Sequence, residues 1–565
     1  MANSQGVGRS AALVIGAASV GTVFEWYDFY LYASLGTVLT PVFFSGVPET
    51  TGFILVLLAF AAGFVVRPFG ALLFGRLGDL WGRKNTFLVT MLLMGLSTVV
   101  VGLLPSYKQI GVAAPLALVA MRLIQGLALG GEYGGAATYV AEHAPAGKRG
   151  LYTSWIQTTA TLGLFLSLLV IVATRFGLDP NGFAHLQAGD FTVSADAKKA
   201  FETWGWRIPF LVSAVLLLIS MWIRLRLKES PLFQQMVEEG TASKKPLVES
   251  FLRWSNLKVV ILALFGAAVG QAVVWYTGQF YALFFLEKIL KVDGALTNVL
   301  VAIALVIGTP FFIFFGWLSD KIGRKPIILL GCLLAAATYF PLFNALTDAA
   351  NPGLAKAEAT APVIVSADPA DCSIQFDPIG KAVFDSSCDI AKSYLAKAGV
   401  PYRSVDAAAG FVALVKVGPE AIPSFRGHGM PKAELKAKRE AFEKSLGALV
   451  KAQGYPAKAD PAKMDKVTVV GILTLLVLYV TMVYGPIAAF LVELFPTRIR
   501  YTSMSLPYHI ANGWFGGFLP FTAFALVAAT GDIYFGLWYP VVAAAATVII
   551  GFFFVKDTRK VDISA

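Results

Sequence analysis

Long uncharged stretches recur along the chain at the length of a membrane-spanning helix. The first, 11–44, is interrupted only by Glu25 and Asp28. A helix needs about 20 predominantly apolar residues to cross the hydrocarbon core of a bilayer. The segment 121–140 qualifies although it contains two charges, which gives twelve candidate spans and predicts a polytopic helical membrane protein. The remaining runs are 51–66, 86–107, 150–174, 208–223, 259–286, 295–319, 326–347, 467–492, 501–531 and 533–555.

Composition and charge support this prediction. Charged residues make up 14% of the chain and hydrophobic residues 57%, whereas soluble domains carry about 25% charged residues. The formal net charge of +11 comes largely from every second short loop, for example 76–84, 321–325 and 556–560. Basic loops stay on the cytoplasmic side, so both termini are predicted to be cytoplasmic. The basic charge is therefore topological, and it predicts a lipid bilayer as partner rather than nucleic acid.

The chain contains an internal duplication. GRLGDLWGRK at 75–84 reappears as GWLSDKIGRK at 316–325, with six of ten positions identical. A second pair, E-x-x-P-x-x-x-R, occurs at 142–149 and again at 493–500. Two pairs in the same order after equivalent spans indicate a repeated six-helix unit, as in many transporters. The first pair lies 241 positions apart and the second 351, so the second half carries about 110 additional residues between its motifs.

Those additional residues form a polar insertion at 348–465, between predicted spans nine and ten. The alternation of basic loops places it outside the cytoplasm. Cys372 and Cys388 lie in it, and cysteines in an extracytoplasmic segment plausibly form a disulfide; two unpaired thiols in a loop are the alternative. The segment 430–454 has helical periodicity and 407–417 fits a strand or a buried helix, which predicts a small folded module.

Ionisable side chains inside the spans are functional candidates, because even the mildest insertion scales set their cost near 3 kcal/mol. Glu25 and Asp28 are three residues apart and share a helical face, with Tyr32 four residues further along. Structural pairing with another span is the alternative to a proton-carrying role for each carboxylate. The complete set of candidates for proton coupling and the substrate cavity is Glu25, Asp28, Tyr32, Arg122, Glu132, Gln271, Gln279, His509 and Asn512.

The chain outside the insertion resembles the major facilitator superfamily, and within it the metabolite:proton symporters, which include transporters of α-ketoglutarate, citrate, shikimate and proline/betaine. The resemblance depends on EWYDFY, RPFGALLFGRLGDLWGRK, RLIQGLALGGEYGGAATYVAEHAP, GWRIPF, LKESPLF and ELFPTRIRYTSMSL. It implies an all-α fold of two six-helix bundles, with spans one, four, seven and ten lining a central cavity. The resulting division is 11–226, a central loop 227–256, spans seven to nine at 257–347, the insertion 348–465, and spans ten to twelve at 466–555.

In this family the loop motif is taken to latch the two halves together on the cytoplasmic side. From the residues alone, Asp79 is expected to cap the start of span three, and the glycines to permit tight turns and close helix approach. By position, the gating residues of the two copies are Gly75, Asp79, Gly82, Arg83 and Lys84, then Gly316, Asp320, Gly323, Arg324 and Lys325.

These observations predict a proton symporter of the bacterial inner membrane that imports a small organic metabolite by alternating access, as a monomer and with no metal or other cofactor. Arg122, a full cation at depth, favours a carboxylate-bearing substrate unless it pairs with Glu132, Glu25 or Asp28. An efflux antiporter is the alternative within transport, and a membrane sensor that uses the insertion is the alternative from another class. No nucleophile–base pair, metal cluster or nucleotide loop indicates an enzyme.

Overall fold

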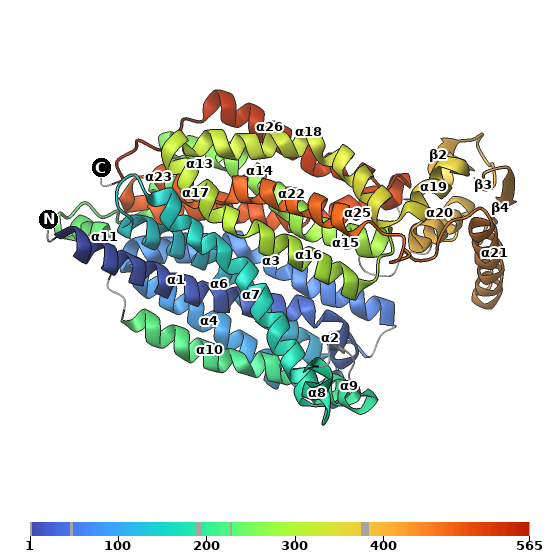
Figure 1. Ribbon diagram of the computed structural model, residues 1–565, viewed down its shortest axis with the longest axis horizontal. Helices are drawn as coiled ribbons and strands as arrows, with labels where there is room; N and C mark the ends of the chain where they lie inside the picture. The colour runs from blue at the N-terminus through green and yellow to red at the C-terminus, as the bar shows by residue number, and fades with distance from the viewer. Residues whose placement is uncertain (1–2, 46–48, 188–193, 227–228, 374–383, 564–565) are drawn as a thin grey trace.

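The computed structural model describes residues 3–45, 49–187, 194–226, 229–373 and 384–563. Long helices run side by side, and both termini lie at one end of the bundle, while the insertion lies at the opposite end (Figure 1). We call these the basic end and the module end. Ten of the described helical segments are long and apolar enough to span a membrane. Two more helices, α1 and α3, are 32 and 33 residues long, so the structure agrees with the expected twelve-span fold.

The N-terminal half contains six long helices. Its elements are α1 (Asn3–Ser34), α2 (Gly36–Phe43), α3 (Glu49–Trp81), α4 (Arg83–Leu103), α5 (Tyr107–Ile110), α6 (Ala113–His143), α7 (Arg149–Gly177), α8 (Gly182–Gln187), α9 (Ala195–Ala200), η1 (Phe201–Gly205) and α10 (Arg207–Leu225). Two short helices, α11 (Pro231–Glu238) and α12 (Pro246–Phe251), lie in the predicted central loop, whose residues 227 and 228 are outside the described residues.

The spans of the C-terminal half are broken more often. Proline lacks the backbone N–H that a helix interior needs, and breaks fall beside Pro310 and Pro486. The elements are α13 (Trp254–Ala263), η2 (Leu264–Ala268), α14 (Val269–Tyr276), η3 (Thr277–Tyr281), α15 (Ala282–Phe284), η4 (Phe285–Ile289), α16 (Gly294–Gly308), α17 (Pro310–Ile322), α18 (Arg324–Ala350), α22 (Lys466–Tyr484), α23 (Ile487–Glu493), η6 (Thr497–Ile499), α24 (Arg500–Ile510), η7 (Ala511–Gly516), α25 (Leu519–Thr530), η8 (Phe535–Leu537) and α26 (Trp538–Phe554).

The repeated motif is helical for most of its length, contrary to the expectation of a loop. Helix α3 continues through Trp81 and α4 begins at Arg83, so only Gly82 separates them. Gly323 separates α17 from α18 in the same way. Their φ angles are 104° and 112°, in a region that side chains rarely adopt. The predicted tight turn is therefore confirmed at these two glycines, and it reverses the chain within one residue.

Glycines in α6 allow it to pack closely on its neighbours. A side chain at Gly126 would collide with the backbone of Gly63 in α3, and one at Gly130 would collide with Arg67. A side chain at Gly134 would collide with Ser505 of α24, in the other half. Regularly spaced small residues permit such approach between membrane helices. Helix α6 thus fits against both halves of the protein.

The insertion is a folded module, as the sequence predicts. Its sheet has the order β2-β1-β3-β4, with β1 (Val363–Ala367) parallel to β2 (Arg403–Asp406) and antiparallel to β3 (Leu414–Val417), which also pairs with β4 (Glu420–Pro423). Strand β3 lies in the segment for which a strand or a buried helix was expected. Its helices are α19 (Pro352–Thr360), the short η5 (Pro369–Asp371), α20 (Ser387–Ala398) and α21 (Lys432–Ala452), the last confirming the predicted helix.

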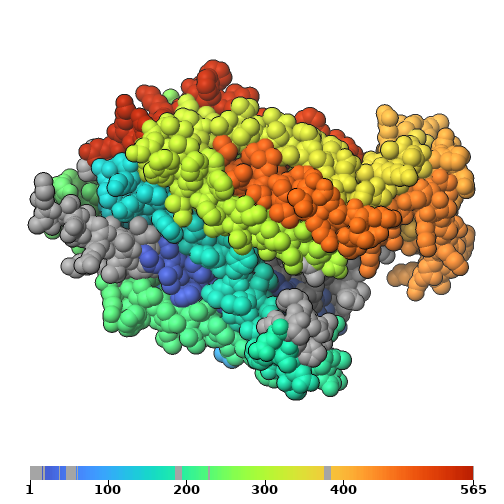
Figure 2. Space-filling model, viewed as in Figure 1, coloured from blue at the N-terminus to red at the C-terminus, as the bar shows by residue number. Residues whose placement is uncertain are grey.

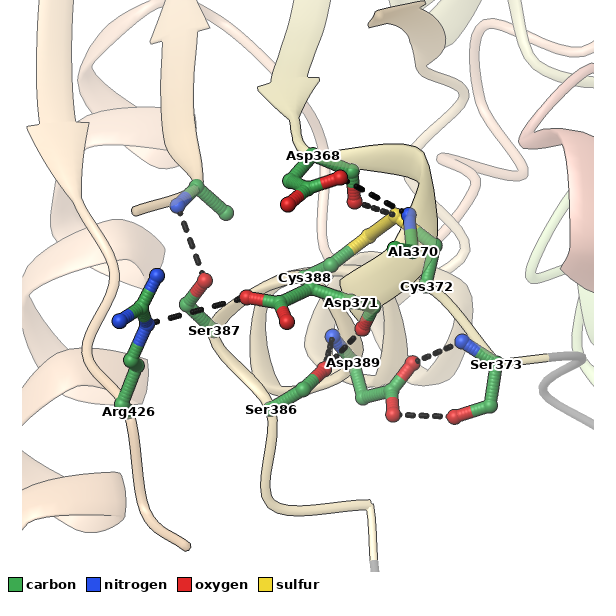
Figure 3. The surroundings of a disulfide bond; sticks show 11 residues. Asp368, Ala370, Asp371, Cys372, Ser373, Ser386, Ser387, Cys388, Asp389 and Arg426 are labelled. Carbon is green, nitrogen blue, oxygen red and sulfur yellow. Dashed lines mark hydrogen bonds and ion pairs between the residues drawn. A yellow bond between two sulfur atoms is a disulfide. The ribbon is translucent and has the colours of Figure 1, made fainter. Parts of the chain in front are cut away.

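A disulfide joins Cys372 to Cys388 beside this sheet (Figure 3). Asp389 accepts hydrogen bonds from the backbone and hydroxyl of Ser373, next to the first cysteine. The carboxylate of Asp368 accepts from the backbone N–H groups of Ala370 and Gly410, at 3.0 and 2.7 Å. The bond therefore links two segments that hydrogen bonds also hold, and residues 374–383 between them are outside the described residues.

The module packs on the end of the bundle rather than hanging from its linkers. Asn351 donates to the carbonyl of Leu290 at 2.9 Å, and the backbone N–H of Tyr402 donates to the carbonyl of Gly531 at 3.0 Å. Buried residues of the sheet and of the C-terminal spans belong to one hydrophobic core. Figure 2 shows the module, in orange, projecting beyond the end of the bundle.

Candidate functional site

The residues of the EWYDFY segment in α1 point to two different sides. Glu25 and Asp28 face into the N-terminal half, where Glu25 Oε1 lies 2.6 Å from Arg224 Nη1 of α10. Asp28 accepts a hydrogen bond from Ser213 of α10, and the hydroxyl of Thr98 of α4 lies beside it. Both carboxylates are at most 5% exposed. They share a face, as predicted, but that face packs inside one half and does not line the interface between halves.

The counter-charge of Glu25 comes from span six. Pairing with Arg122 of span four was considered from the sequence, whereas the structure places Arg224 beside Glu25. Arg224 directly follows the uncharged run 208–223. Glu132 is buried in α6, and its Oε1 has no hydrogen-bond partner within the described part of the chain.

Arg122 is buried inside the N-terminal half. Its guanidinium lies over the ring of Tyr32, 4.3 Å from the ring centre, and Nη1 donates to Gln125 Oε1 at 2.5 Å. Gln125 Nε2 in turn donates to Thr98 Oγ1 at 2.8 Å. Because the Thr98 hydroxyl also lies beside Asp28, a row of neighbouring polar side chains extends from the Asp28 carboxylate to the Arg122 guanidinium.

Arg67 of α3 lies where the two halves meet, and the sequence analysis missed it. The uncharged run ended at Val66, so Arg67 was taken as the end of the span, whereas α3 continues for another fourteen residues. Its guanidinium lies 4.9 Å from the ring centre of Phe29 and 4.5 Å from that of Phe64. It lies beside the hydroxyl of Tyr276 in α14, in the opposite half. The side chain is 3% exposed.

Several polar atoms around Arg67 are buried and unsatisfied within the described residues. They are Arg67 Nε and Nη2, Trp275 Nε1 and both ring nitrogens of His509. Buried polar groups in proteins are almost always hydrogen-bonded, and exceptions call for an explanation. Arg122 lies on the same Phe29 ring, 5.7 Å from its centre. Two arginines and a cluster of unused donors therefore adjoin the interface between the halves.

Aromatic rings close the rest of this interface. Trp26 lies 6.4 Å from Trp275, and Tyr133 of α6 stacks on Tyr508 of α24 with ring centres 3.6 Å apart. Tyr508 bonds to Tyr484 of α22 at 2.9 Å. The aromatic residues of span seven thus face the N-terminal half. Spans one, four, seven and ten meet here.

The remaining candidates lie mostly within the C-terminal half. Gln271 of α14 and Asn512 of η7 form two reciprocal hydrogen bonds, at 3.2 and 3.0 Å. Asn512 therefore pairs with span seven and not with His509, three residues earlier. Gln279 is half-buried. The π-helical turns η3 and η7 fall in these same two spans, and such turns are frequent at functional sites.

At the basic end, Asp79 of α3 caps a helix of the opposite half. Its Oδ2 accepts from the backbone N–H of Thr502 at 2.9 Å, and its Oδ1 from that of Tyr501 at 3.4 Å. The capping interaction predicted for this residue is present, but the helix is α24, in span eleven, and not span three. Gly75 permits the approach, since a side chain there would reach 3.0 Å from Thr502 Cα.

An ionic network surrounds this cap. Arg83 pairs with Asp79 at 2.9 Å and lies 3.7 Å from Glu142, and Glu142 pairs with Arg500 at 2.9 Å. The four side chains are almost completely buried. Glu142 and Arg500 come from the two copies of the E-x-x-P-x-x-x-R repeat, one in each half.

The second copy of the motif forms the mirror arrangement. Asp320 of α17 accepts from the backbone N–H groups of Gly150 and Leu151 at 2.9 and 2.8 Å, at the start of α7 in the N-terminal half. Arg324 pairs with Asp320 at 2.6 Å and with Glu493 at 3.1 Å. Lys84 and Lys325 instead bond to carbonyls of their own halves, at Leu225 and Val555. Each half therefore caps one helix of the other.

Two pseudo-symmetric helical bundles that meet at a buried site define a membrane transporter. Models described as "Sugar (and other) transporter" and "MFS/sugar transport protein" match residues 13–250 and 145–366. The chain belongs to the major facilitator superfamily of sugar and metabolite transporters. It is a multi-pass membrane protein that transports small metabolites by secondary transport, and it is not an enzyme.

Relatives carry the names of several metabolite transporters. The chain is 34% identical over 345 residues to the shikimate transporter of Escherichia coli, covering 60% of this chain and 72% of the relative. It is 34% identical over 339 residues to the alpha-ketoglutarate permease of the same organism, with the same coverage. The proline/betaine transporter of Salmonella typhimurium is 32% identical over 338 residues, covering 58% of this chain and 63% of that protein.

Solved structures share the fold at low identity. The proton:xylose symporter XylE of E. coli, bound to 6-bromo-6-deoxy-D-glucose, matches with a TM-score of 0.63 at 15% identity, covering 99% of this chain and 98% of that one. FucP in its outward conformation matches with a TM-score of 0.53 at 14% identity, covering 96% and 99%. These likenesses support the two-bundle architecture.

Proposed function

We propose that this protein imports a small organic acid together with protons, and that Arg67 holds the carboxylate of the substrate. The observation that carries the proposal is the buried guanidinium of Arg67 at the interface between the halves, with Nε and Nη2 unsatisfied. A carboxylate accepts two parallel hydrogen bonds from guanidinium, a strong and directional contact. Trp275 Nε1 and His509 offer further polar contacts beside it.

Arg67 replaces Arg122 as the favoured substrate ligand. Arg122 already bonds to Gln125 and lies over Tyr32 inside the N-terminal half. Arg67, in contrast, contacts Tyr276 of the other half, so a ligand held there would touch both halves. Alternating access requires a ligand to interact differently with the two arrangements of the halves. A site at the interface meets that requirement.

Asp28 is the carboxylate that we propose carries the proton. Its polar neighbours, Ser213 and Thr98, carry neutral hydroxyls, and a carboxyl group can hydrogen-bond to a hydroxyl in either protonation state. Glu25 has the cation Arg224 at 2.6 Å, and removing charge from a buried ion pair leaves an uncompensated partner. Glu25 is therefore assigned a structural role.

The row of polar side chains from Asp28 through Thr98 and Gln125 to Arg122 supplies a route for coupling. Protonation of Asp28 removes a negative charge beside the Thr98 hydroxyl, and Thr98 accepts from Gln125, the partner of Arg122. Arg122 and Arg67 share the ring of Phe29. Proton uptake and substrate binding are thereby linked over neighbouring side chains.

In this proposal the basic end faces the cytoplasm of a bacterial inner membrane, with both termini inside and the module outside. The capped and ion-paired basic end then holds the cytoplasmic side closed. Both halves of the site come from one chain, so the monomer is the proposed functional unit. The deciding experiment is uptake into proteoliposomes under an imposed pH gradient, inside alkaline. Organic acids, sugars and betaines are compared, and accumulation of none of the organic acids would refute the proposal.

A further inference from the structure

A cavity of about 590 Å³ lies where the insertion module meets the membrane bundle, and Arg67 does not line it. Its walls come from α19, β1, α20 and β2 of the module and from residues 529–532, at the end of α25 and in the turn after it. Small-molecule sites typically have volumes of about 300–1,000 Å³. The polar wall residues that concern us are Glu358, Lys392, Tyr402, Arg403, Ser404 and Asp532.

The junction that forms this cavity is fixed by the fold. Tyr402 is buried, and its backbone N–H donates to the carbonyl of Gly531 at 3.0 Å. Gly531 has a φ of 80°, and its Cα lies so close to Tyr402 that any side chain at position 531 would collide with it. The module and the turn after α25 are therefore held together at one edge of the cavity.

The basic wall of the cavity contains a lysine whose ammonium group pairs with none of the described residues. Lys392 is 6% exposed, lines the cavity, and forms no hydrogen bond or ion pair within the described residues. Asp389 and Asp406 are its acidic neighbours, but burial outweighs them and lowers the pKa of Lys392. Arg403 lines the same cavity and is exposed. A buried ammonium is costly unless an anion or acceptor meets it.

The other wall of the cavity, the acidic wall, carries carboxylates. Glu358 of α19 is half-buried, and burial together with the charges of Asp532 and Asp348 raises its pKa. Asp532 accepts a backbone hydrogen bond from Tyr534 at 2.8 Å. Neither Glu358 nor Asp532 forms an ion pair with Lys392 or Arg403, although all four line one cavity. Charged side chains of both signs therefore line one cavity without forming ion pairs with each other.

We propose that this cavity binds a small zwitterion, a free amino acid or short peptide, whose carboxylate meets Lys392 and Arg403 and whose ammonium meets Glu358 and Asp532. A dicarboxylate would face the acidic wall unpaired, and a diamine would face the basic wall unpaired, so each is disfavoured. The site is distinct from the proposed substrate site at Arg67. On the proposed orientation it opens to the extracytoplasmic side.

The test uses the purified full-length protein carrying Arg67→Gln, so that binding at the proposed substrate site does not contribute. Each common amino acid and glycylglycine is titrated calorimetrically. Succinate, which has two carboxylates, and putrescine, which has two ammonium groups, are titrated for comparison. We expect at least one zwitterion to bind, and Lys392→Met and Glu358→Gln each to weaken it about tenfold or more. Lys416→Met, an exposed lysine of β3, is the matched control and should bind normally.

Three results would overturn the proposal. They are absence of binding by every zwitterion at millimolar concentration, unchanged binding in the Lys392→Met protein, and tighter binding of succinate or putrescine than of any zwitterion. If Lys392→Met fails to fold, Arg403→Ala takes its place, because an exposed side chain can be removed without disturbing the core. Because binding is read directly, the outcome does not depend on whether transport is coupled to protons.

Discussion

Asp79 accepts a hydrogen bond from the backbone N–H of Thr502 at 2.9 Å, across the interface between the two halves and 423 positions along the chain. Its other oxygen accepts from Tyr501. A carboxylate at a helix N-terminus satisfies free N–H groups and interacts favourably with the helix dipole. The start of span eleven is therefore held by the end of span two, and the halves cannot part at the basic end without breaking this cap.

Replacing Asp79 with asparagine should open the basic end more often. Asparagine has one acceptor oxygen where two are used, so one buried N–H loses its partner, at a cost of about 1–3 kcal/mol. Such a change redistributes two states that differ by a few kcal/mol. We expect slower transport and faster maleimide labelling of a Ser505→Cys reporter in a Cys332→Ser background, because Ser505 is fully buried beside Gly134.

The mirror variant and a surface variant test this prediction. Asp320→Asn removes the equivalent cap on α7 and should change labelling in the same direction. Glu238→Gln alters an exposed carboxylate of α11 and should change neither transport nor labelling. Wild-type transport by Asp79→Asn would refute the latch assignment.

Asp28→Asn should uncouple transport from the pH gradient. An asparagine keeps hydrogen-bonding capacity toward Ser213 and Thr98 but cannot take up a proton. Accumulation against a gradient should be lost, while exchange of substrate present on both sides should persist. Glu25→Gln should instead reduce the amount of folded protein, since it leaves Arg224 buried without a counter-charge. If Asp28→Asn still concentrates substrate in response to the gradient, Asp28 does not carry the proton.

Arg67→Gln should weaken binding of an organic acid substrate. Loss of a charge-assisted pair costs about 1.5–3 kcal/mol, which corresponds to a rise in KM of about tenfold to more than a hundredfold. Arg67→Lys should recover only part of the affinity, because ammonium lacks the planar pair of donors. Measured KM values in proteoliposomes check this, with Arg226→Gln, an exposed arginine of the basic end, as control. An unchanged KM in Arg67→Gln would assign the carboxylate to another group.

Thiol labelling tests both the disulfide and the orientation of the module. In intact cells, an impermeant maleimide should modify Cys372 and Cys388 only after mild reduction, because they are bonded. Cys332 is buried in the bundle and should stay unmodified throughout. Labelling of both cysteines without any reductant would show that they are free, and protection after reduction would place the module on the cytoplasmic side.

The module should loosen in acid through Asp368. The backbone N–H groups of Gly410 and Ala370 hold the pKa of Asp368 below its ordinary value of 3.8. A group with a depressed folded pKa contributes stability above its unfolded pKa and loses it as the pH falls through the folded pKa. We therefore compare the rate at which a phosphine reduces the Cys372–Cys388 bond with the rate for a small disulfide. The ratio of the two rates should be higher at about pH 3 than at pH 5.

Asp368→Asn removes this titration. The variant should already be reduced faster than wild type at the higher pH, and its rate should change less on acidification. Glu440→Gln, an exposed acid of α21, is the control and should follow wild type. Equal acid sensitivity in Asp368→Asn and wild type would assign the effect to other carboxylates of the module.

The sequence by itself determined the architecture. Bilayer thickness imposes a fixed length on apolar helices, so spans such as 86–107 and 467–492 are visible without coordinates. The repeated motif revealed the two halves, and the unequal spacing of its copies revealed the insertion. The glycine at position 82 was correctly assigned to a turn because only glycine tolerates a φ of 104° there.

Only the tertiary structure decided which charges meet. Glu25 pairs with a residue 199 positions away, and Asp79 caps a helix of the other half, because the rotation and neighbours of each helix depend on packing that one sequence does not reveal. Arg67 was overlooked because the first charged residue after an apolar run usually marks the end of a membrane span. Its position at the interface depends on the close approach of α3 to span eleven, where a side chain at Gly513 would reach 2.9 Å from the carbonyl oxygen of Phe64. The chemical character of a side chain can be recognised from the sequence, but the residues that it contacts depend on the fold.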